Sequence, residues 1–519
     1  MTSALIDRLR SDLSAAHFDV ETLDSLWGAR AASALFRGQR LPAQREIQAK
    51  RVAGREPAAP AVLASLLMLG MPQPRDAVAS ALPSLGIDGA IELGLIEPAA
   101  PDGEVVRPLI DLRPYGFTDR RGAGHWWIAS DLGELSSGAA LRPDHVLGVG
   151  GASMTLSGLM IAETVESVLD LGTGCGIQAM HASRHARRVV ATDISHRAIA
   201  LARFNAELNE LSNIEFRQGD LFEPVDGERF DQIVSNPPFV ITPRGGVVPE
   251  YEYRDGGMMG DALVAEVIRG AASRLVPGGI AQLLGNWEYR AAEDGLDRAA
   301  AWVDAATVDG RVLDAWVIER EVQDAASYSE TWIRDGGTKP ATAEFDALYA
   351  AWLDDFEARG VESVGFGYLL LRRRADGSAP FRRFERLHEA VGSNPAGLGE
   401  HLADCLAAHD WQSSLSDESL GLATLVVASD VTEERHYWPG DEHPAVITLR
   451  QGGGFARSVE AGTALAALVG ACDGELSVRA ICAALAQLLE ADEASLSAEL
   501  LPSIRELLDT GILLAPIER

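Results

Sequence analysis

Between residues 168 and 240 the chain alternates four short apolar runs with segments patterned as helices. The runs are VLDLG, RVVATD, IEFRQGD and FDQIVSN, and each ends in a small, acidic or amide residue. Apolar strands separated by helices are typical of repeated β-α units and of a parallel sheet buried on both faces. Ligands of such sheets bind at the carboxyl ends of the strands. We therefore expect the chemistry of the chain at that edge.

The first run leads into a glycine turn. Asp170 lies near the end of the run, and Gly172, Gly174 and Gly176 follow it. A nicotinamide-dinucleotide fingerprint, G-x-G-x-x-G, would need glycine at position 177, where Ile177 stands. A G-x-G-x-G turn lets the backbone pass close to a small charged ligand without cradling a pyrophosphate.

Acidic residues end the second and third runs. Asp193 follows the glycines by about twenty residues, and a carboxylate there can accept both hydroxyls of a ribose. An alternative is a helix cap, because Ser195 and the residues after it have a helical pattern. Both roles are compatible at one turn. The third run ends at Asp220.

The fourth run ends in Asn236-Pro237-Pro238-Phe239. With the glycine turn and the two aspartates, this order and spacing resembles the class I S-adenosylmethionine-dependent methyltransferases over residues 145–290. The motif N-P-P-[FY] marks their branch that methylates planar amide or amino nitrogens. That branch includes the release-factor glutamine methyltransferases, the ribosomal-RNA guanine-N2 methyltransferases and the adenine-N6 methylases.

The resemblance implies S-adenosylmethionine as cofactor. It places the three glycines at the methionine part, Asp193 at the ribose and Asp220 at the adenine edge, and it counts Asp170 and Leu221 among the residues that bind the cofactor. Asn236 would border both the cofactor and the methyl acceptor. It also implies an α/β fold with a Rossmann-like, doubly wound, seven-stranded sheet whose seventh strand, near residues 364–374, runs antiparallel.

The chemistry of the N-P-P-F corner supports this reading. A delocalised amide or exocyclic amine is a poor nucleophile and must be held in line with the methyl donor, and orientation can lower a barrier by about 7–11 kcal/mol. The Asn236 side-chain oxygen and the Pro237 carbonyl can accept two N–H bonds. Consecutive prolines restrict the backbone of the corner. Phe239 can stack on a planar group.

Flanking the central segment, helical and strand patterns predict two further domains. Residues 1–130 combine short helices with a strand at 104–116 and its partner at 124–130, a pattern typical of winged-helix modules. Residues 131–376 form the catalytic domain, beginning with a glycine loop and a helix at 158–166. Beyond a turn-rich boundary, residues 381–519 form an acidic, winged-helix-like domain. Winged helices bind DNA, RNA, proteins or neighbouring domains, so the pattern alone identifies no partner.

Composition excludes several classes of function. The net charge of −31 disfavours non-specific binding to nucleic acid. No apolar stretch is long enough to span a bilayer, and the four cysteines show no C-x-x-C pairing. The first residues lack the pattern of a signal peptide, and we expect none. We expect a cytoplasmic protein, and near-absence of lysine suggests a GC-rich bacterial source. His436, Asp441, Glu442 and His443 cluster in a loop, but their spacing favours a solvated loop over a metal site.

The sequence thus predicts an N-methyltransferase that needs no metal and acts on a protein glutamine or a ribosomal-RNA base. A small-molecule N-methyltransferase and a catalytically inactive, cofactor-binding regulatory scaffold are the alternatives. Neither the acceptor nor the oligomeric state follows from the residues. The segment of residues 326–360 is longer than a usual connection, and we expect helices there over one edge of the sheet.

Overall fold

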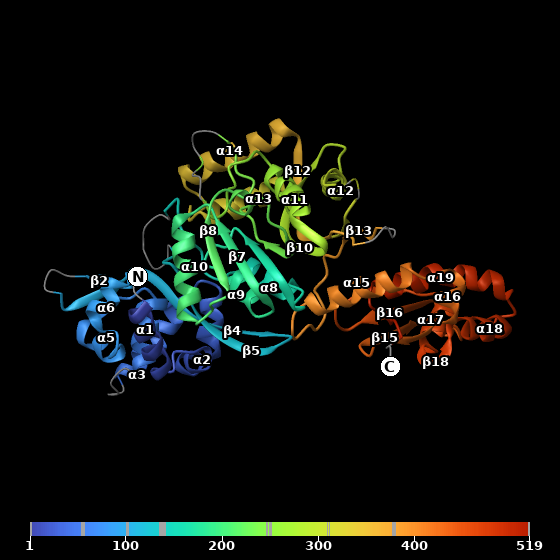
Figure 1. The fold of residues 1–519 in the computed structure, drawn as a ribbon, viewed down its shortest axis with the longest axis horizontal. Helices are drawn as coiled ribbons and strands as arrows, with labels where there is room; N and C mark the ends of the chain where they lie inside the picture. Colours follow the sequence, from blue (N-terminus) through green and yellow to red (C-terminus); the bar gives the residue numbers. More distant parts are fainter. Residues whose placement is uncertain are drawn as a thin grey trace.

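Three regions follow one another along the long axis of the protein (Figure 1). A computed structural model describes residues 3–52, 58–99, 103–133, 142–244, 248, 252–308, 310, 312–375 and 380–516. The amino-terminal region is helical with short strands, the central region is built on one large sheet, and the carboxyl-terminal region is again mixed. Among the described residues, no helix combines the length and apolarity needed to cross a bilayer.

The amino-terminal region packs helices around a small sheet and a long hairpin. Its elements are α1 (Ser3–Ala15), α2 (Val20–Phe36), α3 (Leu41–Val52), α4 (Ala59–Leu63), the π-helical turn η1 (Ala64–Met68), α5 (Arg75–Ala81), α6 (Gly86–Glu92), β1 (Gln73–Pro74), β2 (Ile96–Pro98), β3 (Val105–Pro108), β4 (Ile110–Asp119) and β5 (Gly122–Asp131). The predicted strand at 104–116 is two strands in the structure. β3 pairs with β1 and β2, whereas β4 pairs with β5 along its whole length.

A mixed sheet forms the centre of the molecule, in the order β13-β11-β12-β10-β9-β6-β7-β8. Its strands are β6 (Val165–Leu171), β7 (Ala186–Asp193), β8 (Ile214–Gln218), β9 (Phe230–Ser235), β10 (Leu275–Arg290), β11 (Asp314–Asp324), β12 (Val361–Arg372) and β13 (Arg382–Arg386). Strands β6 to β10 run parallel to one another, and β12 runs antiparallel between β10 and β11, as predicted. The four apolar runs of the sequence are β6, β7, β8 and β9.

The sheet has eight strands rather than the seven predicted. The additional strand is β13, which pairs in parallel with β11. Its sequence, RRFER, lacks the apolar run of a central strand because it lies at the edge of the sheet with its side chains half-exposed. Sequence patterning therefore gave it no strand signal.

Helices cover both faces of the sheet. They are α8 (Gly151–Leu159), α9 (Ile177–Ser183), α10 (His196–Leu208), α11 (Ala262–Arg274) and α12 (Gly295–Ala305), with the short turn η2 (Glu223–Val225). Helices α11 and α12 share a core with β10 and β11, whereas α9 and α10 share the core of the amino-terminal region. Doubly wound sheets are covered in this way.

The long connection between β11 and β12 forms two helices, α13 (Ala325–Asp335) and α14 (Ala343–Arg359). Asp324 caps α13 by accepting from the Ser327 amide at 2.9 Å, and Thr342 caps α14. We refer to residues 325–359 as the insertion. Because β12 starts where β10 ends, with Val361 opposite Arg290, the insertion lies at the carboxyl edge of the parallel strands.

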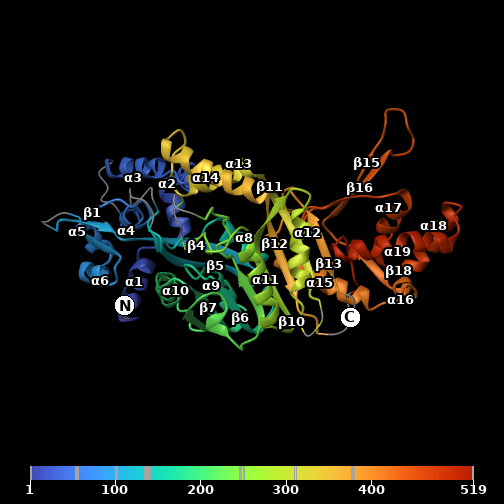
Figure 2. The ribbon, with the colours of Figure 1, turned by 90° about the horizontal axis from the view of Figure 1, so that it is seen from above.

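A separate core holds the carboxyl-terminal region together. Its elements are α15 (Gly399–Ser413), α16 (Asp417–Leu422), α17 (Thr463–Gly470), α18 (Val478–Leu488), α19 (Glu493–Asp509), β14 (Thr424–Val427), β15 (Val431–His436), β16 (Val446–Gln451), β17 (Ser458–Glu460), β18 (Asp473–Ser477) and β19 (Leu513–Leu514). The β15–β16 hairpin projects from the body of the protein (Figure 2). Trp438 beyond the end of β15 is 69% exposed.

The amino-terminal hairpin is bound tightly to helix α10. The Asn205 side-chain amide accepts from the Ala129 backbone N–H at 2.7 Å and donates to the Ala129 carbonyl at 2.9 Å. Asn209 bonds the backbone of Trp127 in the same two directions. The same Asn205 amide also donates to the Cys175 carbonyl in the glycine turn at 2.8 Å. One buried side chain therefore joins the hairpin to the turn.

Candidate active site

Strand register brings the glycine turn and the N-P-P-F corner together. Leu171 at the end of β6 pairs with Ser235 at the end of β9, so Gly172 and Asn236 leave neighbouring strands at the same level. The Ser235 hydroxyl donates to the Leu171 carbonyl at 2.8 Å and holds the two strand ends in place. The corner thus lies beside the turn at the carboxyl edge, where ligands of such sheets bind.

The glycine turn has the backbone that its sequence indicates. Gly172, Gly174 and Gly176 have φ angles of 75°, 55° and 90°, in the left-handed region that favours glycine. Among the described residues, no atom outside the immediate chain neighbours lies within 4 Å of a Cβ placed at Gly172 or Gly174. At Gly176 a Cβ would lie 3.0 Å from the Ala202 Cβ. The first two glycines therefore border open space for a ligand, and the third allows close packing on α10.

Asp170 is fully buried behind this turn. Its Oδ2 accepts from the Thr173 hydroxyl at 2.6 Å and from the Ala179 amide at 2.9 Å, while its Oδ1 has no partner among the described residues. Burial raises the pKa of this carboxyl to about 7, against the lowering effect of the two hydrogen bonds. A buried carboxylate with one bare oxygen is stabilised by a nearby positive charge, as a cofactor with a sulfonium and an ammonium group would provide.

Asp193 ends β7 beside the turn. Its Oδ2 accepts from the Gly174 amide and its Oδ1 from the Ser195 amide, both at 2.9 Å. Burial raises the pKa of Asp193, and the charge of Glu252 adds to the rise. Each carboxylate oxygen retains capacity for a further hydrogen bond, so both can still accept a ribose hydroxyl.

The residues predicted at the adenine edge follow β8. Asp220 is exposed, and Leu221 is half-buried with a φ of 42°. A cavity of about 810 Å³ opens next to the ends of β7 and β8 and is bordered by Ile194, Ser195, Gln218 and Glu252. Its opposite wall comes from residues 93–95 and 109–110 of the amino-terminal region. The carboxyl edge is therefore open on this side.

The corner carries two acceptor groups. Asn236 is half-buried where the chain leaves β9, and its side-chain amide can offer an acceptor oxygen. The buried Pro237 offers its carbonyl, which accepts from the Phe239 amide at 2.7 Å and keeps a second lone pair. The half-buried Phe239 ring lies edge-on to Phe366, with 6.4 Å between ring centroids.

Two loops meet over this edge. The Glu252 amide donates to the Pro143 carbonyl at 3.0 Å, and the rings of His145 and Tyr253 lie 5.9 Å apart. On its other side the 142–150 loop is held by Asp131, whose carboxylate accepts from the Val146 amide. In the sequence, only the glycines of the 142–150 loop indicated that its backbone could approach another group closely.

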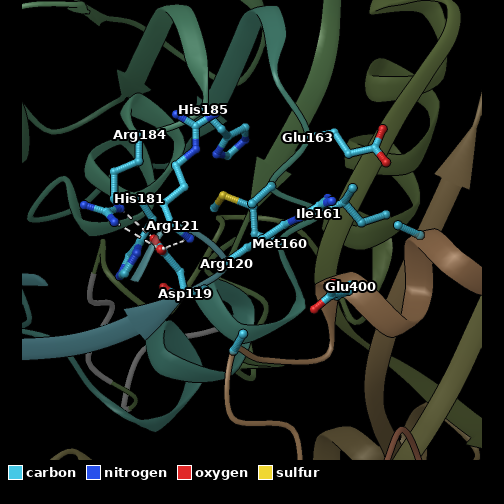
Figure 3. Close-up of a pocket in the computed structure, with 15 residues that line it drawn as sticks. Asp119, Arg120, Arg121, Met160, Ile161, Glu163, His181, Arg184, His185 and Glu400 are labelled. Carbon is cyan, nitrogen blue, oxygen red and sulfur yellow. Dashed lines mark hydrogen bonds and ion pairs between the residues drawn. The ribbon is translucent and has the colours of Figure 1, made fainter. Parts of the chain in front are cut away.

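A second, small cavity lies away from this edge (Figure 3). It has a volume of about 30 Å³, which suits a water molecule but no cofactor. Asp119 of the hairpin pairs with Arg184 at 2.6 Å there, and Glu400 of α15 borders the same space. The cavity therefore lies where the three regions meet.

Metal and disulfide chemistry find no site within the described ranges. No group of three or more His, Cys, Asp or Glu side chains there is arranged to hold a metal ion. That result includes the predicted loop cluster of His436, Asp441, Glu442 and His443. All four cysteines are buried and unpaired.

Comparison with known families divides the chain into three matches. Residues 150–301 match the family described as "Methyltransferase small domain". Residues 15–108 and 403–515 match two families described as domains of unknown function. The match to the methyltransferase family contains every site residue predicted from the resemblance.

Individual relatives agree with this family. The chain is 37% identical over 150 residues to a release factor glutamine methyltransferase of Xylella fastidiosa, covering 27% of the chain and 54% of the relative. It is 41% identical over 83 residues to the Aliivibrio fischeri protein of that name, covering 15% and 29%. A ribosomal protein uL3 glutamine methyltransferase of Bradyrhizobium diazoefficiens is 32% identical over 164 residues, covering 30% and 50%.

The chain thus spans about half or less of the length of these curated relatives. The central part of the chain carries a class I S-adenosylmethionine-dependent methyltransferase domain, and the family predicted from the motifs is confirmed.

Proposed function

We propose that this protein is an S-adenosylmethionine-dependent N-methyltransferase that acts on a planar amide nitrogen of a protein, a glutamine side chain being the first candidate. The observation that carries the proposal is the position of Asn236. It stands beside Pro237 and at the level of Gly172, one strand away from the glycine turn.

The residues of the turn fit the cofactor. The open space beside Gly172 and Gly174 accommodates the methionine part, and the bare Oδ1 of Asp170 favours positive charge nearby. Asp193 retains acceptor capacity for the ribose, and Asp220 with Leu221 follows the adjacent strand on the adenine side. When bound, the cofactor supplies a methyl group activated by its sulfonium.

At the corner, the Asn236 oxygen and the Pro237 carbonyl accept the two N–H bonds of the acceptor amide. Holding those bonds turns the nitrogen lone pair toward the methyl group and stabilises the positive charge that develops on nitrogen. Phe239 packs against the planar group. The surplus proton leaves to solvent.

Charge favours a protein acceptor. A net charge of −31 repels the phosphates of RNA. The relatives that match are named for glutamine side chains of release factors and of ribosomal protein uL3. A ribosomal-RNA base, a small molecule and an inactive cofactor-binding scaffold are the other outcomes to be tested.

The decisive experiment is transfer of a tritiated methyl group to fractionated bacterial lysate, with parallel samples treated with protease or ribonuclease. Label that survives ribonuclease but not protease supports a protein acceptor. Label that is lost to ribonuclease identifies RNA. Cofactor binding without transfer to any fraction supports the scaffold and contradicts our proposal.

For the flanking regions we propose roles in substrate docking. We retain residues 1–130 and 381–519 as winged-helix-like domains around a catalytic domain of residues 131–376. The proposal is supported by short helices with hairpins in both regions. With 19 acidic and 6 basic residues between positions 401 and 519, the carboxyl-terminal domain suits protein contacts better than nucleic acid. We place the protein in a bacterial cytoplasm.

A further inference from the structure

We infer that Asn286 and Tyr328 are positioning residues that hold the N-P-P-F corner in its acceptor-binding geometry. The inference rests on the proposed function and adds two residues that neither the motif nor its spacing indicates. Asn286 belongs to β10, and Tyr328 belongs to α13 of the insertion.

Asn286 lies beside the corner. Leu283 of β10 pairs with Ser235, so Asn286 stands three residues further along, level with the chain that leaves β9. Its exposed fraction is 0%, and its Nδ2 donates to the Phe239 carbonyl at 2.8 Å. Its Oδ1 has no partner among the described residues. A buried amide kept at this place indicates a local requirement, because an unsatisfied polar atom costs stability.

Tyr328 holds the chain two residues further on. Its hydroxyl accepts from the Ile241 amide at 2.8 Å, and the Asn286 Nδ2 lies 3.4 Å from the same oxygen. Its ring stacks on Phe366 at 5.6 Å between centroids, and Phe366 in turn contacts the Phe239 ring. The side chain is fully buried, and burial raises the pKa of its phenol, so the hydroxyl stays protonated.

The residue between Phe239 and Ile241 is held as well. The Val240 amide donates to the Arg254 carbonyl at 2.8 Å. The Arg254 guanidinium itself donates to the Trp332 carbonyl of α13 at 2.9 Å. Backbone groups of residues 239–241 are therefore bound by β10, by residue 254 and by α13. Helix α13 makes one of these contacts directly and supports a second one through the Arg254 side chain.

We call the contacts of Asn286, the Arg254 carbonyl and Tyr328 with residues 239–241 the clamp. The clamp explains why the insertion lies beside the corner. A planar acceptor must sit in line with the methyl donor, and a displacement of about 1 Å can reduce the rate roughly 100-fold. The corner ends a strand, and the residues after it are in no helix or strand. Contacts from β10, residue 254 and α13 supply the rigidity that a loop lacks on its own.

The test uses the full-length chain and two single-atom changes. Tyr328→Phe removes the hydroxyl and keeps the ring packing. Tyr289→Phe is the matched control, because its hydroxyl donates at 2.5 Å to Glu319 of β11 rather than accepting from the backbone that follows β9. We expect Tyr328→Phe to lower the single-turnover methyl-transfer rate about 10-fold or more while the calorimetric affinity for S-adenosylmethionine stays within about twofold. Tyr289→Phe should keep the rate.

A wild-type rate in Tyr328→Phe would overturn the inference, and so would an equal loss in the Tyr289→Phe control. Asn286→Ala combined with Tyr328→Phe should lose less than the sum of the two single changes, because both act on one segment. Full additivity would contradict a shared clamp.

A second readout separates this inference from the proposed function. Amide hydrogen exchange in peptides covering residues 236–244 needs no substrate. Tyr328→Phe should speed exchange at Ile241, whereas Tyr289→Phe should leave it unchanged. If Tyr328→Phe exchanges faster at Ile241 while the wild-type protein transfers no methyl group, the inference stands and the proposed function is rejected. Unchanged exchange would reject the clamp whatever the activity.

Discussion

The two halves of the candidate site are built in different ways. In the cofactor half, the contacts join residues that are close in the sequence. Asp170 accepts from the Ala179 amide, 9 positions away, and Asp193 accepts from the Gly174 amide, 19 positions away. In the acceptor half, Phe239 and Ile241 are held across 47 and 87 positions. The first half is a local motif that carries its own support. The second is a local motif supported by distant parts of the chain.

The largest effect should come from the acceptor half. We expect Asn236→Ala to reduce kcat by about 100- to 1,000-fold, as loss of one oriented hydrogen-bonding group does at other sites. Affinity for S-adenosylmethionine, measured by calorimetry, should not change, because Asn236 carries no contact that supports the turn. Asn213→Ala, which removes hydrogen bonds to Ser183 and Ala186, is the control for general destabilisation. Equal turnover in Asn236→Ala and the wild type would refute the assigned role.

In the cofactor half we expect the opposite result, a loss of cofactor affinity without a loss of kcat. Asp193→Ala should weaken S-adenosylmethionine about 10- to 100-fold, since hydrogen bonds to a charged group contribute roughly 1.5–3 kcal/mol. At saturating cofactor, kcat should remain close to that of the wild type. A loss of kcat with unchanged affinity would show that the two halves are not separable. Equilibrium titration and saturation kinetics on the same preparation distinguish the outcomes.

A smaller and pH-dependent effect should come from Asp170. With its pKa raised to about 7, the carboxyl is mostly protonated at pH 6 and mostly charged at pH 8. A positively charged cofactor binds the charged form better, so affinity should rise about tenfold between these pH values. Asp170→Asn should remove the slope. A wild-type affinity that is flat over this range would contradict coupling between Asp170 and the cofactor.

These differences explain how far the sequence could go. The glycine turn, Asp193 and the N-P-P-F corner were found because each lies at a strand end with a characteristic spacing. The helix predicted at 158–166 lies instead at Gly151–Leu159, because its glycine-rich start did not resemble a helix entry. β13 was missed because an edge strand of charged residues has no apolar pattern.

No sequence pattern indicated the residues that act through contacts distant in the chain. Asn286 stands in an ordinary buried strand, and only the pairing of β10 with β9 places it at the corner. Tyr328 could be recognised as a core residue, yet its hydrogen bond to Ile241 depends on how the insertion returns over the sheet. Glu252 acts on Asp193 through a loop whose course no periodicity describes.

The single amide of Asn205, shared between the hairpin and the glycine turn, has a practical consequence. Residues of α9 and α10 belong to the same apolar core as α1, α2 and the hairpin. A fragment trimmed to residues 131–376 would expose that core to water and leave the Cys175 carbonyl without an anchored donor. A minimal enzyme for crystallisation or engineering should therefore keep the first 130 residues, since the glycine turn is held in place by contacts with them.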